Sequence, residues 1–338
     1  MKGAQQPISS QGSAIILPRR FKFARFRGVG QSMRPSRTVA TALATVSDVT
    51  SYQGVKVGFQ GKSGAYSEIA CQKAFPGCDA CPCKTFDDAF KALAENEVNQ
   101  ALLPMENSTG GTVHDVYLLL PKYGLHIVGE YSLGVEHCLL GPPGSKISDI
   151  RKVTSHWQAL AQCTQFCERM GFQMEQHEDT AGAAYDVSQN KWGDVAAIAS
   201  TRAADIYGLQ ILEKGIQNND LNYTRFVGLS TSPIDPPKDL AAEECKTTIM
   251  FACRDGAGGL QMLLAKLLAL DINLEKIEPQ AMVDDPLIDK KTGRSFNYLF
   301  IADFAGSIAD DPFQKAFELF EEYTGFYRVL GSYQRHVF

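Results

Sequence analysis

Residues 172–207, which read FQMEQHEDTAGAAYDVSQNKWGDVAAIASTRAADIY, contain the pattern that decides the fold of this chain. Residues 172–177 are expected to form a strand that leads into a helix over 180–189, and the apolar run 195–199 leads into a helix over 201–207. Short strands that alternate with helices are typical of an α/β fold with mainly parallel strands. We therefore predict an α/β sheet for this part of the chain.

The same alternation continues towards the N-terminus and a little beyond the opening stretch. Strand–helix pairs are expected at 55–59 with 65–75, at 101–104 with 113–120, and at 152–154 with 158–170, and an extended run covers 223–230. The proline-rich segment 232–238, SPIDPPK, can continue neither a helix nor a central strand. We place a domain boundary there.

The residues after this segment follow a different order of elements. A strand over 247–253 precedes a helix, and two strands over 274–282 and 296–304 follow it. Asp311 is expected to cap a second helix, with Pro312 at its first position, before a last strand over 327–333. The first helix has one leucine-rich face, made by Leu260, Leu263, Leu264, Leu267 and Leu268. The order βαββαβ predicts an α+β unit of the ferredoxin-like type.

Charge is distributed unevenly along the 338 residues, whose formal net charge is −5. Residues 1–53 carry eight basic residues and a single acid, so their charge of +7 leaves −12 for residues 54–338. An acidic body disfavours a nucleic-acid role, and no apolar run is long enough to span a membrane. The Arg- and Ser-rich, acid-poor segment 1–53 is typical of an organelle transit peptide. The alternative is a disordered basic tail that has no targeting function.

The nine cysteines do not predict a disulfide framework, because their number is odd and their spacing is irregular. Cys78, Cys81 and Cys83 lie close together, but a zinc site would need a fourth ligand, and we find no second pair. We expect reduced cysteines, with a redox-sensitive loop around Cys81 as the alternative.

Four junctions at which a predicted strand meets a helix are rich in hydroxyls, amides and glycines: 61–67 (GKSGAYS), 106–112 (ENSTGGT), 155–158 (SHWQ) and 179–182 (DTAG). Ligands of open α/β sheets bind outside the carboxyl ends of the strands, where helix N-termini favour anions. Ordinary helix capping is the alternative, but the two consecutive glycines of 106–112 exceed what capping needs. The junctions predict a cleft for a small ligand with more than one carboxylate.

Arg225 lies inside the apolar run 223–230. Burying an arginine is costly unless the guanidinium meets a carboxylate. That carboxylate can belong to the protein or to a ligand, and the pattern alone leaves both alternatives open.

The triplet Thr224-Arg225-Phe226, together with 106–112, 155–163 and 179–184, resembles the prephenate/arogenate dehydratase family, with the motifs in the same order from residue 55 onward. The resemblance implies two α/β lobes like those of type 2 periplasmic binding proteins, an ACT regulatory domain and a homo-oligomer, dimer or tetramer. The implied bounds are 1–53 for a transit peptide, 54–232 for the catalytic domain, 233–245 for a linker and 246–338 for the ACT domain. The leader and the ending 326–333 are similar to the plant and algal branch, which implies the plastid stroma and a preference for arogenate.

The family resemblance also implies a chemistry, the decarboxylative dehydration of arogenate to phenylalanine or of prephenate to phenylpyruvate. Aromatisation drives this reaction, so we expect no cofactor and no metal. Thr224 would hydrogen-bond the leaving hydroxyl and Arg225 would hold a carboxylate, while the proton source would be Glu106 or His156. The remaining implied residues are Asn107, Ser108 and Thr109 around the ring, Ser155 and Thr180 opposite, and Phe226 as packing support.

The chain departs from the family pattern at two places. Trp157 stands where the family has a proline, and the Glu-Ser-Arg-Pro motif of the ACT domain reads Glu-Pro-Gln-Ala from Glu278. The Gly-Ala-Leu turn is degenerate over 256–260, which includes Gly258, Gly259 and Leu260. We predict that feedback inhibition by phenylalanine, the expected effector, is weakened or absent.

Two other functions are compatible with parts of the sequence. A non-catalytic amino-acid sensor would share the fold but would have no reason to keep Thr224 and the 107–112 run. A nucleotide-binding oxidoreductase is disfavoured, because the glycine-rich turn 58–64 has the wrong spacing for GxGxxG.

Overall fold

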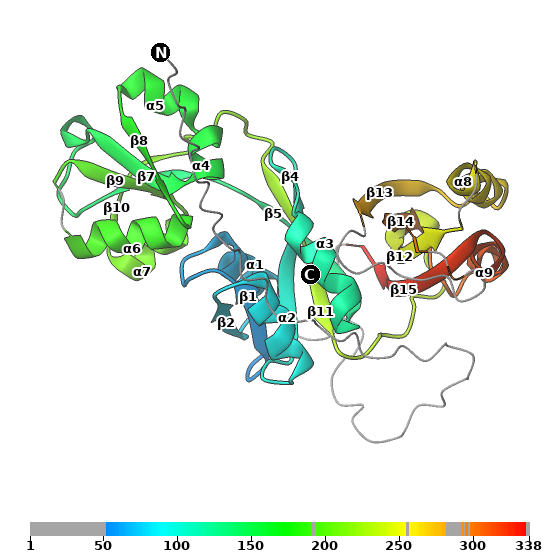
Figure 1. Ribbon diagram of the computed structural model, residues 1–338. Helices are drawn as coiled ribbons and strands as arrows, with labels where there is room; N and C mark the ends of the chain where they lie inside the picture. Colours follow the sequence, from blue (N-terminus) through cyan, green and yellow to red (C-terminus); the bar gives the residue numbers. More distant parts are fainter. Residues whose placement is uncertain are drawn as a thin grey trace, which may run out of the picture. The chain divides into compact units, whose positions relative to one another are not determined.

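Three β-sheets organise the part of the chain that the structure describes, and their elements are labelled in Figure 1. The structure is a computed structural model that describes residues 52–190, 193–254, 257–281, 293, 295, 296 and 298–335. The expected leader up to residue 51, Gly256 and Met282 lie outside these residues.

Sheet A has the strand order β2-β1-β3-β11-β5, and β4 pairs with β3 at its end. β1 runs parallel to β2 and β3, whereas β11 is antiparallel to both of its neighbours. Its strands are β1 (Lys56–Gln60), β2 (Asp79–Cys83), β3 (Gln100–Asn107), β4 (Gly111–Thr112), β5 (His126–Gly134) and β11 (Tyr223–Ser230). With the helices α1 (Tyr66–Ala74), α2 (Phe86–Ala94) and α3 (His114–Tyr123), this sheet forms lobe A.

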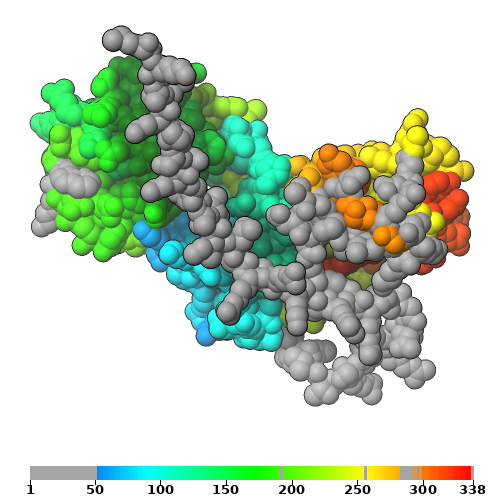
Figure 2. All heavy atoms as spheres, in the orientation of Figure 1, coloured from blue at the N-terminus to red at the C-terminus, as the bar shows by residue number. Residues whose placement is uncertain are grey.

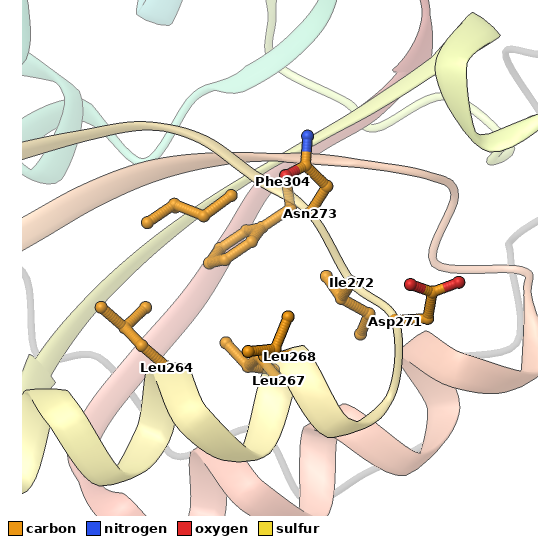
Figure 3. A pocket seen from close by; sticks show the side chains of 8 residues that line it. Leu264, Leu267, Leu268, Asp271, Ile272, Asn273 and Phe304 are labelled. Atoms are coloured by element: carbon orange, nitrogen blue, oxygen red, sulfur yellow. The ribbon is translucent and has the colours of Figure 1, made fainter.

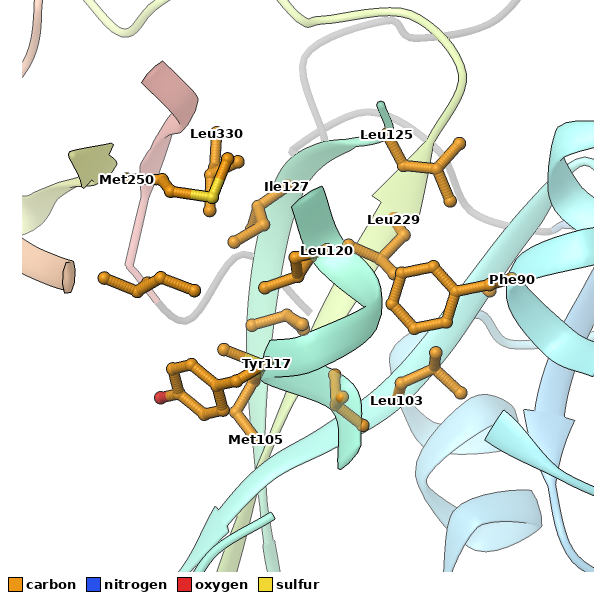
Figure 4. Close-up of a cluster of buried hydrophobic side chains, with 14 of the residues drawn as sticks. Phe90, Leu103, Met105, Tyr117, Leu120, Leu125, Ile127, Leu229, Met250 and Leu330 are labelled. Carbon is orange, nitrogen blue, oxygen red and sulfur yellow. The ribbon is translucent and has the colours of Figure 1, made fainter. Parts of the chain in front are cut away.

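Sheet A is covered on both faces, because successive side chains of a strand point to opposite sides. Leu102 of β3 packs with Phe226 and helix α1, whereas Leu103 packs with Phe90 and Tyr117 on α2 and α3. Figure 4 shows the second cluster, in which Phe90, Leu103 and Tyr117 lie among leucine and isoleucine side chains. Each such fully buried side chain contributes about 1.5–3 kcal/mol.

Sheet B has the strand order β10-β6-β9-β7-β8. β7 runs parallel to β8 and β9, while β6 is antiparallel to β9 and β10. Its strands are β6 (Cys138–Gly141), β7 (Lys152–His156), β8 (Gln173–His177), β9 (Val195–Ala199) and β10 (Gln210–Lys214). Lobe B adds α4 (Trp157–Gln162), α5 (Thr164–Met170), α6 (Thr180–Asn190), α7 (Thr201–Tyr207) and the short η1 (Ile147–Asp149).

The chain passes between the lobes twice, through residues 135–137 and 215–222. The strands on either side of these crossovers, β5, β6, β10 and β11, are the antiparallel ones. The expectation of mainly parallel strands was therefore wrong in detail. In each lobe, antiparallel strands next to the crossovers complete the sheet beside its parallel βαβ part.

The C-terminal unit forms a four-stranded antiparallel sheet of order β13-β14-β12-β15. Its elements are β12 (Cys245–Cys253), α8 (Gly259–Ala269), β13 (Leu274–Ala281), β14 (Tyr298–Ala305), α9 (Asp311–Tyr323) and β15 (Thr324–Gln334), preceded by η2 (Ala242–Glu244). Leucines of α8 and phenylalanines of α9 pack on this sheet in one core cluster. The predicted ferredoxin-like order is confirmed, and so is the fold class of two α/β lobes with an α+β unit.

The C-terminal unit packs against lobe A. Met250 and Leu330 lie in the same cluster as Leu120 and Ile127 (Figure 4), and the space-filling view shows atoms of the two regions in contact (Figure 2). A Cβ atom at Gly331 would lie 2.0 Å from the carbonyl oxygen of Ile127. Only glycine allows β15 to approach β5 this closely.

Several local expectations differ from the structure. The helix expected over 158–170 is two helices that meet at Cys163, and Asp310 rather than Asp311 occupies the N-cap of α9. Tyr52 falls inside the expected leader, yet it is buried and packs edge-on against Phe75 at 5.1 Å. We did not predict β2, α2, β4, β5, β6 and β10. β2 is an edge strand with a proline, which weakens any strand signal.

All nine cysteines have free thiols. Across the described ranges, no helix is both long and apolar enough to cross a membrane. The described residues also contain no group of three or more His, Cys, Asp or Glu side chains placed to hold a metal ion.

Candidate active site

The centre of the candidate site is the pair Asn107 and Thr224, which lie opposite each other on β3 and β11. The amide Nδ2 of Asn107 donates to Thr224 Oγ1 over 3.0 Å. The Asn107 Oδ1 atom accepts from the backbone N–H groups of Thr109 and Gly110, at 3.1 and 2.7 Å, which orients the amide. Thr224 thus accepts a hydrogen bond but donates none to any described residue, so its proton is free for a ligand.

A β-bulge in β3 places Asn107 on the face of Thr224. Phe226 pairs with Pro104 and Arg225 pairs with Glu106, so Met105 is left without a partner in this ladder. Such an extra residue reverses the side to which the following side chains point. Pro104 fits next to the bulge because it has no N–H to contribute.

Gln162, at the end of α4, connects lobe B to this pair. Its Nε2 donates to Asn107 Oδ1 over 3.3 Å and to Thr109 Oγ1 over 2.5 Å. Its Oε1 accepts from Asn222 Nδ2 at 3.1 Å and lies 2.8 Å from His137 Nε2. A single amide therefore joins residues from both lobes.

Asn222 and His137 lie on the two crossovers, and each is only 2% exposed. Asn222 Oδ1 accepts from Asn107 Nδ2 at 2.8 Å. The other ring nitrogen of His137 lies 2.8 Å from the hydroxyl of Tyr66. Burial lowers the pKa of His137, against the opposing effect of Gln162, so the imidazole is neutral near pH 7.

Sequence reasoning missed Gln162, Asn222 and His137 as site residues. Asn222 stands two positions before Thr224, so the strand period of two could have suggested a shared face. Gln162 lies in the run 155–163 that carries the family resemblance, but no role was assigned to it. His137 precedes a strand that was not predicted and had no local signal.

The four polar junctions meet in pairs across the lobes. Lys62 Nζ of the first junction lies 3.7 Å from a carboxylate oxygen of Asp179. A Cβ atom at Gly110 would lie 1.6 Å from Nε2 of Gln158, which shows how closely the second and third junctions approach. The run 106–112 was expected to lead directly into a helix. Instead, Gly111–Thr112 forms β4, which pairs antiparallel with β3 before the helix begins.

Other predicted site residues have different surroundings. The Ser108 hydroxyl donates to the Leu221 carbonyl at 2.9 Å and accepts from the Tyr223 N–H at 2.9 Å, which ties the hairpin to β11. Ser155 is fully buried and donates to the Ile198 carbonyl at 2.6 Å. Thr180 begins α6, and Phe226 is buried in the cluster beneath α1.

Arg225 points to the face opposite Thr224, where it meets carboxylates of the protein. Its nitrogens lie 3.2 Å from Glu106, 2.8 Å from Glu130 and 2.8 Å from Asp303, and the side chain is 10% exposed. Burial disfavours its charge, but the acids, Asp303 foremost, raise the pKa of Arg225 well above its ordinary value. Of the two alternatives left open by the sequence, the structure contains the internal ion pair.

The two expected proton sources are both poor acids near neutral pH. Burial works to raise the pKa of Glu106, but Lys276 and Arg225 outweigh it and hold the pKa below the usual value, so the group is a carboxylate. Burial lowers the pKa of His156. Its Nδ1 accepts from the Gln158 N–H at 3.4 Å, which places the ring at the start of α4.

The predicted regulatory residues lie in the C-terminal unit. Glu278 accepts from the Thr112 hydroxyl at 3.0 Å and lies 3.9 Å from His114. Gly258 has a φ of +84° immediately before α8 begins at Gly259, and Leu260 is half-buried against the sheet.

Two hollows occur away from the candidate site. One, of about 260 Å³, lies at the end of α8, where Figure 3 shows Leu264, Leu268, Ile272 and Phe304 around it. Another, of about 160 Å³, lies beside α5 and residues 213–218. The first is mostly apolar and lacks converging polar groups, so we place the chemistry at the Asn107–Thr224 cluster.

Comparisons with known proteins cover most of the chain. The family described as prephenate dehydratase matches residues 57–234. A protein of Arabidopsis thaliana named arogenate dehydratase/prephenate dehydratase 2, chloroplastic, is 46% identical over 279 residues, which are 82% of this chain and 72% of the relative.

Two solved structures are also similar to this chain. A prephenate dehydratase from Arthrobacter aurescens in complex with L-Phe has a TM-score of 0.73 at 25% identity, over 83% of this chain and 90% of that one. GqqA, described as a novel type of quorum quenching acylase, has a TM-score of 0.75 at 33% identity, over 83% and 98%. The family match and the identity to the plant relative show that this chain belongs to the prephenate dehydratase family.

Proposed function

We propose that the chain is an arogenate dehydratase, which converts L-arogenate to L-phenylalanine by loss of CO2 and the ring hydroxyl. Prephenate, with a keto acid in place of the amino acid, is the second candidate substrate. The observation that carries the proposal is Thr224, whose hydroxyl is oriented by Asn107 and keeps its proton for a ligand. The curated relatives named arogenate dehydratase support the substrate.

In the proposed reaction the bond to the ring carboxylate breaks, and its electron pair enters the ring as CO2 leaves. The ring bond to the hydroxyl breaks at the opposite carbon, and the departing oxygen takes that pair as hydroxide. Thr224 donates a hydrogen bond to this oxygen as its charge develops, which stabilises the transition state. Aromatisation of the ring supplies the driving force, and the hydroxide takes a proton from solvent.

The amides of Asn107, Gln162 and Asn222 are the proposed partners of the substrate's polar groups. In the structure these amides form hydrogen bonds with one another across the two lobes. A substrate with two carboxylates and a hydroxyl can replace these contacts when the lobes separate, without leaving a buried polar group unpaired. Ser155, Thr180 and His156 remain proposed residues of the opposite wall.

Arg225 and Glu106 have a different proposed role from the one first expected. The guanidinium of Arg225 is already committed to three carboxylates, so it does not hold the substrate directly. Glu106 is ionised and paired with Lys276, so it does not donate the proton. Thr224 is bonded to an amide and not to a base, so its hydroxyl is not activated as a nucleophile.

The enzyme would work in a plastid. Residues 1–53 would direct the chain to the plastid stroma, residues 54–232 would form the catalytic domain and 233–245 the linker. Residues 246–338 would form an ACT domain, and the enzyme would be a homo-oligomer, dimer or tetramer. The name of the Arabidopsis relative, which contains the word chloroplastic, supports the plastid.

The test is to incubate the full chain with arogenate and, separately, with prephenate, and to quantify phenylalanine and phenylpyruvate by chromatography. Arogenate is expected to be turned over with the higher kcat/KM. If a folded protein turns over neither substrate but binds phenylalanine, the chain is an amino-acid sensor and the proposal is wrong.

Phenylalanine is expected to inhibit this enzyme only weakly. The Glu-Pro-Gln-Ala motif lacks the arginine of the family pattern, and Glu278 is already bonded to Thr112. We expect less than about twofold inhibition, below the roughly 5- to 150-fold coupling that is typical of allosteric effectors. The triple variant Pro279→Ser, Gln280→Arg, Ala281→Pro rebuilds the motif and should be inhibited more. Strong inhibition of the unmodified enzyme would contradict the prediction.

A further inference from the structure

We propose that the C-terminal sheet is a working part of the catalytic site in the absence of any effector. Asp303 and Lys276 of this sheet hold Arg225 and Glu106, and these two position the neighbouring catalytic pair, Thr224 and Asn107. The inference rests on the proposed dehydratase function.

The register of the two site strands places the catalytic pair next to the charged pair. Thr224 pairs with Asn107, and the next pair along the ladder is Arg225 with Glu106. Adjacent residues of a strand point to opposite faces, so one pair faces the substrate region and the other faces the C-terminal sheet. A shift of Arg225 or Glu106 is transmitted through one peptide unit to Thr224 or Asn107.

The tip of these strands is not held by a regular ladder alone. The bulge at Met105 interrupts the β3–β11 ladder immediately before the Arg225–Glu106 pair. A bulge bends a strand and disrupts the ladder locally, so the end of β3 that carries Glu106 and Asn107 is less constrained by β11 than a regular strand would be. On its other side β11 stays in regular register with β5 at Thr224 and Arg225. The charged contacts on the far face therefore add a constraint on how the two site strands lie relative to each other.

Those charged contacts are strong. Arg225, Lys246 and Lys276 meet Glu106, Glu130 and Asp303, which balances three positive charges with three negative ones. Asp303 is 6% exposed and Glu130 is 3% exposed. Buried charges with matched partners tolerate little movement, because separating them leaves a charge unpaired in a poorly solvated place.

Asp303 is itself held rigidly. Thr248 of β12 donates to Asp303 Oδ1 over 2.7 Å, so the other carboxylate oxygen is directed at Arg225, 2.8 Å away. Arg225 also donates to the hydroxyl of Tyr333 on β15 at 3.3 Å. Two strands of the C-terminal sheet, β14 and β15, therefore contact the guanidinium, and Thr248 of β12 holds both Asp303 and Tyr333.

The C-terminal sheet also contacts the partner strand, β3. Lys276 and Glu278 are two apart on β13, so they share a face. Lys276 pairs with Glu106, and Glu278 accepts from Thr112 on β4 at 3.0 Å. The C-terminal sheet thus contacts β11 at Arg225, and it contacts the β3–β4 hairpin at Glu106 and Thr112. These contacts can set the distance between β11 and the hairpin.

The decisive experiment is Asp303→Asn in the full chain, assayed with arogenate. The substitution keeps the shape and removes the charge opposite Arg225. We expect kcat to fall about tenfold or more, as misplacement of a catalytic group does, with KM changed less than about twofold. Asp303→Glu, which restores the charge, should recover most of kcat.

Asp87→Asn is a control for the same change of charge at a more exposed ion pair, since Asp87 is 47% exposed. Asp87 also accepts from a cation and a hydroxyl, Lys122 at 2.6 Å and Tyr123 at 2.9 Å, but it has no contact with the Arg225 network. We expect its kcat to match that of the unmodified enzyme. The double variant Thr224→Ala, Asp303→Asn separates positioning from a general loss of structure. In a protein that already lacks the Thr224 hydroxyl, Asp303→Asn should lower kcat by less than about twofold, because no hydroxyl remains to be positioned.

The outcomes are distinct. Unchanged kcat in a folded Asp303→Asn, or an equal loss in both backgrounds, overturns the inference while the dehydratase function stands. Absence of turnover by the unmodified enzyme overturns the function and this inference together. If Asp303→Asn does not fold, Lys276→Gln on the edge strand β13 is the second variant, and it should lower kcat without a matching rise in KM.

Discussion

Replacing Thr224 with alanine is expected to lower kcat for arogenate by about 10²- to 10³-fold, the usual cost of removing one donor to a developing negative charge. The Thr224 hydroxyl is the group in the cluster that accepts from Asn107 and keeps its own proton free. KM should change much less, because the hydrogen bond strengthens only as the hydroxide departs. Steady-state kinetics with chromatographic detection of phenylalanine measures both.

Two controls accompany this variant. Thr224→Ser keeps the hydroxyl and should retain most of the activity, and the thermal unfolding midpoint of Thr224→Ala should stay close to that of the unmodified protein. Thr224 is half-buried at the edge of its cluster, so the loss of a methyl and a hydroxyl leaves no large cavity. Full activity in Thr224→Ala would exclude it as the donor.

Replacing Glu130 with glutamine is expected to destabilise the fold by about 3–5 kcal/mol, the typical result of removing one partner of a buried ion pair. Glu130 is 3% exposed and accepts from Arg225 at 2.8 Å and from Lys246 at 2.7 and 3.0 Å. The neutral amide would leave two buried cations without their shared carboxylate. Denaturant unfolding at pH 7 measures the free-energy difference.

The same variant has a defined pH dependence. Burial works to raise the pKa of Glu130, but Arg225 and Lys246 outweigh it and lower the pKa below the ordinary 4.5. A carboxyl group whose pKa is lowered by folding stabilises the protein above its unfolded pKa, and that contribution is lost as the pH falls through the folded value. The difference between the two proteins should therefore be largest at neutral pH and shrink below pH 4.5.

Glu175→Gln provides the control for a surface pair. Glu175 lies 2.8 Å from Lys152 but is 56% exposed, so solvent screens the pair. We expect a change of less than about 1 kcal/mol. A similar small change in Glu130→Gln would mean that the network contributes little to stability.

Much of the fold followed from local periodicity. The strand–helix alternation of lobe B and the βαββαβ order of the C-terminal unit depend on side-chain spacing within each segment, and both are confirmed. Strands such as β5 and β6 escaped prediction because they flank a crossover, where pairing with distant strands decides the structure. Pairing of that kind leaves little trace in a single segment.

The sequence by itself determined which chemistry is available, namely the hydroxyl of Thr224, the amide of Asn107 and a charged Arg225 between apolar neighbours. The tertiary structure alone decided where these groups point. The bulge at Met105 turns Asn107 towards Thr224, and the same ladder turns Arg225 towards Asp303. Gln162 joins the site from another lobe. Register, bulges and contacts between lobes arise from residues far apart in the chain, so no local pattern encodes them.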